Sequence, residues 1–218
     1  MKLAPFLLAV LTASCATAGP REDFFRAVAV DNPGAVRSQI ERGLDPNVQD
    51  DKQQTALVIA LREGSPKVAR VLIDAPKTDV NATNGSGESP LMMAALRGQQ
   101  EFVDLLLKRD AAVNKTGWAP LHYAATTGQV AIMKQLLEQH AFIDAQSPNG
   151  TTPLMMAAMY GTADSVKLLL AEGADTAMKN EQGMTALDFA RRGNRPDAIE
   201  LIGAAAARAP QRQGSGKW

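Results

Sequence analysis

The sequence has few of the residues on which disulfide, thiol or metal chemistry depends. It contains one cysteine, Cys15, and two histidines, His122 and His140, in 218 residues. A single cysteine cannot form an intramolecular disulfide, and the chain has neither an H-x-x-x-H nor a C-x-x-C spacing. No nucleophile accompanies a histidine in an arrangement typical of a catalytic triad. We therefore expect no cofactor, no metal, no small-molecule substrate and no enzymatic activity.

The chain also lacks an excess of charge of either sign. It has 23 basic and 23 acidic residues, and no stripe of lysine and arginine. Because nucleic-acid binding depends on such a stripe, we expect no nucleic-acid partner. An early apolar run, residues 5–11, is shorter than the roughly 20 residues that a membrane-spanning helix needs.

Residues 1–18 are typical of a signal peptide. A basic start at Lys2 is followed by that short apolar run and by an A-x-A cleavage pattern at residues 16–18. We expect cleavage after Ala18 and a periplasmic location. An alternative is an outer-membrane lipoprotein, because residues 11–15 resemble a lipoprotein box that ends at Cys15. Only in that case is a membrane expected as a partner.

One short phrase recurs five times along the remaining chain. The copies are TALVIALREG, SPLMMAALRG, APLHYAATTG, TPLMMAAMYG and a looser TALDFARRGN. They begin at residues 55, 89, 119, 152 and 185, so the spacings are 34, 30, 33 and 33. Self-similarity at this period is typical of a stacked repeat protein. Its function is therefore expected on a surface.

Each phrase predicts a short inner helix. Ser or Thr precedes it in four of the five copies, as an N-cap. Three copies continue with proline at the first helical position, where the missing N–H costs no hydrogen bond. Those prolines are Pro90, Pro120 and Pro153. Four copies end on a glycine that we expect to be a left-handed C-terminal cap. Those glycines are Gly64, Gly98, Gly128 and Gly161. A second, amphipathic helix follows each phrase.

Polar, turn-rich segments between the units favour short β-hairpin fingers. Together with the TPL-type starts, the AAxxG helix ends, GAD at residues 173–175 and RGLDPN at residues 42–47, they resemble the ankyrin repeat family. The resemblance covers roughly residues 22–206, and the chain is similar to small exported bacterial ankyrin-repeat proteins. It implies an all-α repeat solenoid of stacked helix–loop–helix units.

The resemblance divides the chain into three parts: a signal peptide at 1–18, an ankyrin repeat domain at 19–206, and a disordered tail at 207–218. We expect six units, of which the first and last are capping repeats. The expected units are 22–54, 55–88, 89–118, 119–151, 152–184 and 185–206.

One junction breaks the repeat. Compared with the segment that leads to Pro153, the segment that leads to Pro120 is three residues shorter. Ala119 stands in place of the capping Ser or Thr, a loss of about 1 kcal/mol. Trp118 occupies a position that the resemblance places on the concave, partner-facing side. Tryptophan is a frequent binding hot spot. Two interpretations stay open: Trp118 contacts a partner in a notch beside a truncated finger, or it folds over the shortened hairpin as a local repair.

The repeat register supplies the other candidate contacts, at the ends of the inner helices. With Trp118, the expected partner-binding residues are Arg62, Glu63, Leu96, Arg97, Met159 and Tyr160. The methionines of the inner helices favour core packing, with an adaptable or oxidisable surface as the alternative. His122 resembles the family's structural histidine, which ties a helix start to an adjacent hairpin. Pro120, Gly128, Pro153 and Gly161 are also expected to be structural.

These features predict a protein-interaction module of the bacterial envelope that binds an unidentified protein through its concave face and fingers. One alternative is an immunity or inhibitor protein that plugs an enzyme. Another is an accessory factor in envelope oxidative defence that uses its methionines.

Overall fold

The computed structural model describes residues 19–208, and this part of the chain forms twelve helices and no strand. The predicted all-α repeat solenoid is confirmed. Six inner helices line one side: α1 Pro20–Ala29, α3 Ala56–Glu63, α5 Pro90–Leu96, α7 Pro120–Thr126, α9 Pro153–Tyr160 and α11 Ala186–Arg192. Six outer helices line the other: α2 Pro33–Glu41, α4 Pro66–Asp74, α6 Gln100–Lys108, α8 Val130–Glu138, α10 Ala163–Ala171 and α12 Pro196–Arg208.

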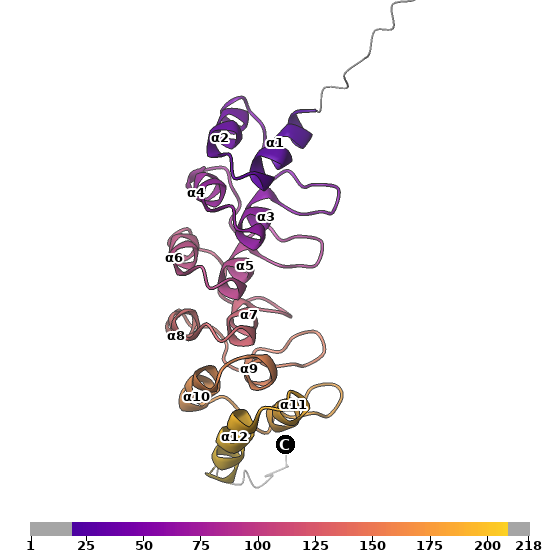
Figure 1. Ribbon diagram of the computed structural model, residues 1–218, viewed down its shortest axis with the longest axis vertical. Helices are drawn as coiled ribbons and strands as arrows, with labels where there is room; N and C mark the ends of the chain where they lie inside the picture. Colours follow the sequence, from indigo (N-terminus) through magenta and orange to yellow (C-terminus); the bar gives the residue numbers. More distant parts are fainter. Residues whose placement is uncertain (1–18, 209–218) are drawn as a thin grey trace, which may run out of the picture.

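The stack is a curved ladder of helix pairs. In Figure 1 the outer helices follow the convex side, the inner helices lie beside them, and the loops project from the concave side. Each inner helix packs on its own outer helix and on the inner helices before and after it. α12 reaches Arg208, two residues beyond the expected end of the domain. The rest of the expected tail, and the whole expected signal peptide, lie outside the described residues.

The predicted β-hairpin fingers are wrong in detail. Between residues 19 and 208 the only β pairing is an isolated antiparallel bridge, Gln49 with Thr55. A typical loop is instead held by two backbone bonds, from the Asn84 N–H to the Glu88 carbonyl at 3.0 Å and from the Gly87 N–H to the Asn84 carbonyl at 2.8 Å. The next residue, Ser89, already caps α5. The chain therefore enters a helix before a ladder of strand pairs can form.

Most of the predicted caps have the expected geometry. The side chains of Thr55, Ser89, Thr152 and Thr185 each accept the N–H three residues further on. Gly128 follows α7 with a φ of +67°, in the left-handed region. The left-handed conformation expected at Gly161 is wrong, because its φ is −78°. Glycine is required there by close packing, since a Cβ would lie 2.5 Å from the Ala125 carbonyl oxygen.

Small residues let the inner helices approach closely. Six buried alanines lie between α5, α7 and α9: Ala94, Ala95, Ala124, Ala125, Ala157 and Ala158. Met92, Met93 and Met155 are also buried in this layer. These three methionines therefore pack in the core, as the first interpretation expected.

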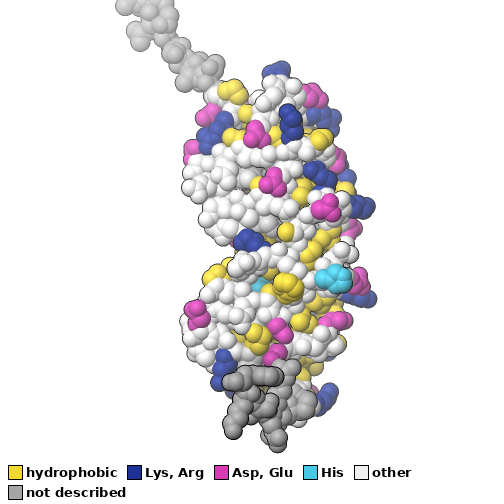
Figure 2. Space-filling model, turned by 180° about the vertical axis from the view of Figure 1, so that it is seen from behind, with side chains coloured by type: hydrophobic (Ala, Val, Ile, Leu, Met, Phe, Trp, Pro, Cys, Tyr) yellow, Lys and Arg dark blue, Asp and Glu magenta, His cyan; other side chains and the backbone are white. Residues whose placement is uncertain are grey.

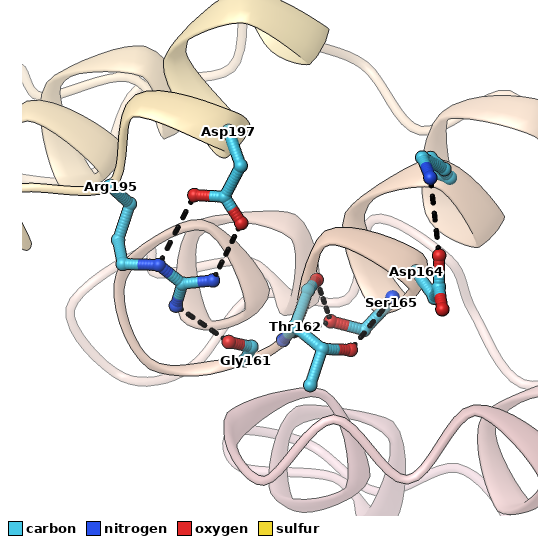
Figure 3. A network of polar contacts seen from close by, with 7 residues as sticks. Gly161, Thr162, Asp164, Ser165, Arg195 and Asp197 are labelled. Atoms are coloured by element: carbon cyan, nitrogen blue, oxygen red, sulfur yellow. Dashed lines mark hydrogen bonds and ion pairs between the residues drawn. The ribbon is translucent and has the colours of Figure 1, made fainter.

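The junction between α9 and α10 shows how polar groups join successive units (Figure 3). Thr162 Oγ1 accepts the Ser165 N–H at 3.2 Å, and Ser165 Oγ accepts the Thr162 N–H at 2.9 Å. From the next unit, Arg195 donates to the Gly161 carbonyl at 2.6 Å while Asp197 holds its guanidinium group. The cation thus lies at the C-terminal end of α9, where the helix dipole favours positive charge.

A column of side-chain amides joins the units beneath the loops. Asn47, Asn81 and Asn114 each accept a backbone N–H from the following unit and donate to a carbonyl there. Asp144 takes the same position in the next unit and accepts the Asp175 N–H at 3.0 Å. An ionised carboxylate has no N–H to donate, so this step of the column makes one bond where the others make two.

Candidate functional site

The short loop, residues 113–118, interrupts the row of loops on the concave side. On one side of it, the Gly85 N–H donates to the Gln53 carbonyl at 3.0 Å and joins loops 50–54 and 84–88. On the other, the Glu181 N–H donates to the Asn149 carbonyl at 3.0 Å and joins loops 147–151 and 180–184. Within residues 19–208, no backbone bond joins the short loop to a neighbouring loop.

The short loop projects less than its neighbours (Figure 1), and seen from behind, the outline of the molecule is hollowed at that level (Figure 2). We call this gap, between loops 84–88 and 147–151, the notch. Pro148 borders it, at the loop position where Gly85 and Glu181 donate their N–H groups. Proline has no such donor.

An apolar hollow of about 200 Å³ lies at the notch. Side chains from α5, α7, α9 and the short loop line it: Leu96, Trp118, His122, Tyr123, Thr126 and Met156. We refer to this space as the hollow. The hollow brings together two of the predicted partner-binding residues, Leu96 on α5 and Trp118 at the broken junction.

Trp118 is half-buried and stands edge-on to two other rings. Its ring centroid is 5.2 Å from that of His122, at an interplanar angle of 75°. It is 6.4 Å from that of Tyr123, at 77°. Edge-to-face pairs of this kind are favourable. Trp118 thus has features of both interpretations, because part of the indole packs on α7 while another part lines the hollow.

Tyr123 connects the hollow to the preceding loop. Its hydroxyl donates to Glu88 Oε1 at 3.1 Å, and the Asn84 amide donates to Glu88 Oε2 at 2.7 Å. Burial, and then the charge of Glu88, raise the pKa of the Tyr123 phenol, so it stays a neutral donor. Both oxygens of the Glu88 carboxylate are therefore held by this chain's own side chains.

His122 forms the buried floor beneath Trp118. Its Nδ1 accepts the Ala119 N–H at 3.2 Å, and its Nε2–H donates to the Thr151 carbonyl at 3.0 Å. Burial lowers the pKa of His122, against an opposing effect of the Thr151 carbonyl. The neutral ring ties the start of α7 to the next loop. The Ala119 side chain cannot cap the His122 N–H, which instead donates to the Ala119 carbonyl at 3.0 Å.

The other predicted contact residues are dispersed. Arg97 is exposed directly after Leu96. Arg62 is held by Glu63 at 2.9 Å and by Gln54 at 2.7 Å. These residues lie at the ends of their helices and do not line the hollow.

At the end of α9, Met159 packs against Gly193, whose added Cβ would lie 3.2 Å from the Met159 side chain. Tyr160 is 56% exposed. Neither residue lines the hollow. Of the predicted partner-binding residues, Leu96 and Trp118 therefore line the hollow, and the others do not.

Sequence reasoning missed Tyr123 and Met156, which line the hollow. Both occupy the fifth place of the repeat phrase, counted from the capping position, where Ile59 and Phe189 suggest ordinary core. The hydroxyl of Tyr123 was the available signal, because a tyrosine at an otherwise apolar position usually extends its polar end to a partner.

The described part of the chain has neither a metal-binding cluster nor a membrane-spanning helix. Residues 19–208 hold no group of three or more His, Cys, Asp or Glu side chains placed to bind a metal ion. In the same range, no helix combines the length and the apolar composition needed to cross a bilayer.

Six stacked helix pairs with loops on the concave side define a repeat-type binding scaffold. The family model described as ankyrin repeats (3 copies) matches residues 24–116, 75–147 and 132–209. The chain belongs to the ankyrin repeat family.

Two curated relatives share part of the stack. The ankyrin repeat and SAM domain-containing protein 6 of Rattus norvegicus is 34% identical over 70 residues, which are 32% of this chain and 8% of the relative. Its Danio rerio counterpart is 32% identical over 85 residues, 36% of this chain and 12% of the relative. The match thus spans only a small part of each relative's own length.

Solved structures cover most of the chain. The human ASB11 ankyrin repeat domain has a TM-score of 0.74 at 28% identity, covering 89% of this chain and 88% of that one. An ankyrin repeat domain from Acinetobacter baumannii AYE has a TM-score of 0.70 at 25% identity, with coverages of 85% and 98%.

A third structure is the complex of a predatory endopeptidase from Bdellovibrio bacteriovorus with an immunity protein. One of its chains has a TM-score of 0.72 at 24% identity, with coverages of 84% and 97%. At that identity the likeness shows the fold alone.

Proposed function

We propose that this chain is a protein-interaction module of the bacterial envelope and that it binds a protein partner at the notch. Ankyrin repeats are generally protein-interaction modules, which supports the class of function. The hollow beside Trp118 is the observation that carries the site. An apolar recess at the middle of a concave face, with a partly accessible indole in its wall, is typical of a binding hot spot.

The test compares two aromatic residues. Trp118→Ala removes a wall of the hollow, whereas Phe142→Ala removes an aromatic side chain that is 67% exposed and does not line the hollow. A photo-crosslinking residue at Thr126 should capture a partner from envelope extracts. We expect Trp118→Ala to weaken binding of the captured partner by at least 2 kcal/mol, about 30-fold in affinity, and Phe142→Ala to leave the affinity unchanged.

Thermal melts of the same variants separate binding from folding. A Trp118→Ala protein that is destabilised by about 3 kcal/mol, but whose folded fraction captures the partner normally, would identify Trp118 as a repair of the short loop. Equal capture from Thr126 and from a crosslinker at Lys134, on the outer helix α8, would also contradict a site at the notch.

The envelope location rests on residues 1–18. N-terminal sequencing of the exported chain should begin at Gly19. Fatty-acid labelling that disappears with Cys15→Ser would instead support the lipoprotein alternative.

The two functional alternatives use the same fold differently. An inhibitor would place its partner enzyme's active site against the notch, and an enzyme that loses activity when captured through Thr126 would favour that role. The methionine-based role requires accessible thioethers. Met159 and Met184 are only half-buried, but Met92 and Met155 are fully enclosed. The interaction module is therefore the function that the site supports best.

A further inference from the structure

We infer that the notch takes an acidic segment of its protein partner, an extended stretch that places one large apolar side chain in the hollow and aspartate or glutamate within a few residues of it. This inference rests on the proposed function and adds the chemistry of the partner. It follows from the size of the hollow, from the uncharged surface around it and from the unpaired cations beside it.

The hollow has room for one side chain. Its volume of about 200 Å³ equals roughly six or seven waters at their share of liquid volume. Leu96 and Met156 supply apolar contacts, and the rings of Trp118 and Tyr123 supply aromatic ones. A single phenylalanine, leucine, methionine or tryptophan from a partner is the kind of group that such a recess binds.

Two long segments of the chain around the hollow carry no charged side chain. Residues 116–133 and 145–163 contain no Lys, Arg, Asp or Glu. They include α7, α9 and the loop before α9. The histidine among them, His122, is buried and neutral. A partner residue above α7 or α9 therefore meets no charge from these segments.

Two cations without an acidic partner in residues 19–208 precede this neutral area, one at the C-cap of α5 and one on the short loop. Arg97 is exposed and directly follows Leu96, a wall of the hollow, and it forms no ion pair within residues 19–208. Lys115 lies on the short loop three positions before Trp118, with its amino nitrogen 3.3 Å from where a Cβ on Gly87 would lie. Lys115 also lacks an ion pair in the described part of the chain. Figure 2 shows Lys or Arg atoms where the outline is hollowed.

The carboxylate beside the hollow, Glu88, already accepts hydrogen bonds from this chain. Glu88 receives hydrogen bonds from Tyr123 and Asn84, one on each carboxylate oxygen. Further along the concave side, Arg62 is paired with Glu63. Because both donors to Glu88 are neutral, this carboxylate keeps its negative charge, but its oxygens are held by this chain. Arg97 and Lys115 outnumber it at the notch and have no acidic partner within residues 19–208. Opposite charge on the partner is the complementary arrangement.

The test is a selection from a phage-displayed library of random 12-residue peptides, against the full chain as purified from expressing cells. Parallel selections use Trp118→Ala, the double variant Arg97→Glu with Lys115→Glu, and a control with Lys67→Glu and Lys134→Glu, two exposed lysines on outer helices. The unaltered chain and the control should enrich peptides with Phe, Leu, Met or Trp beside Asp or Glu. The double variant should enrich Lys or Arg in their place.

Affinities of the enriched peptides give the second readout. We expect binding to the double variant to be at least 10-fold weaker than to the unaltered chain, and binding to the unaltered chain to weaken as salt rises, because exposed charges are screened. Peptides that depend on Trp118 but show no acidic preference would overturn this inference and leave the proposed function standing. Failure to enrich any peptide that depends on Trp118 would overturn both.

Discussion

The short junction and the regular junctions differ at the tip of the loop and agree beneath it. At the tip, loop-to-loop backbone bonds are present on both sides of the notch and missing at residues 113–118. Beneath it, Asn114 still makes both bonds of the amide column, to Phe142 and His140, each at 2.8 Å. His122 meanwhile accepts the N-cap N–H, as Met92 and Met155 do at the regular junctions. The tips can therefore change without loss of the stack, which leaves them free to carry function.

The largest expected effect is the loss of stability when a core leucine is truncated, and it should be the same at the short junction and at a regular junction. Leu121 beside the short loop and Leu154 beside a regular loop are both fully buried. Leu121→Ala and Leu154→Ala should each lower the free energy of unfolding by about 2–5 kcal/mol. Urea denaturation should place the two losses within about 1 kcal/mol of each other. A much smaller loss for Leu121 would mean that the deletion has loosened the core as well as the tip.

An intermediate effect is expected when His122 is replaced by the residue that regular junctions use. Met92 and Met155 occupy its position in α5 and α9, and their sulfur atoms accept the N-cap N–H. His122→Met keeps that contact but removes the Nε2–H donor to the Thr151 carbonyl, which still accepts the Ser147 N–H at 2.9 Å. It also removes the edge-to-face contact with Trp118. The expected loss from the two contacts together is about 1–3 kcal/mol in urea denaturation.

The same residue gives a pH dependence. Burial lowers the pKa of His122 in the folded chain, so the unfolded chain binds a proton more readily. Stability should fall as the pH drops below about 6.5, the ordinary histidine value, until the folded ring also titrates. The His122→Met variant should lack this contribution, whereas His140→Asn, at an exposed residue with a φ of +63°, should retain it. If replacing His122 left the pH profile unchanged, the assignment to this ring would be wrong.

The smallest expected effect concerns the incomplete step of the amide column. Asp144→Asn should restore the missing donor to the following unit and remove a charge near Asp175, stabilising the fold by about 1 kcal/mol. Burial, and then the charge of Asp175, raise the pKa of Asp144 against the opposing Asp175 N–H. Protonation therefore favours the folded state, and the advantage of Asn should shrink as the pH falls. Asn114→Asp should show the opposite sign at neutral pH.

The sequence predicted the helices because their signals are local. Capping residues, helix-starting prolines and the three- and four-residue spacing of apolar side chains each lie within one unit. The hollow was only half predicted, because its walls come from three helices and the short loop. Which residues meet there depends on how far Trp118 turns back over α7, and that depends on packing. The role of Gly161 was missed for the same reason. Only glycine fits at this position because the Ala125 carbonyl oxygen, in the preceding unit, occupies the space that a Cβ would need.

Pro148 has a consequence for self-association. Rows of unpaired backbone groups attract further chains by strand-like pairing, and proteins often block such rows with proline. The break in the loop row would otherwise expose a donor at this position, as Gly85 and Glu181 show by using theirs. With proline at that position, a loop from a second copy finds no N–H on residue 148 to pair with. The protein can therefore keep an open recess on its concave face while one wall of that recess resists backbone pairing with its own copies.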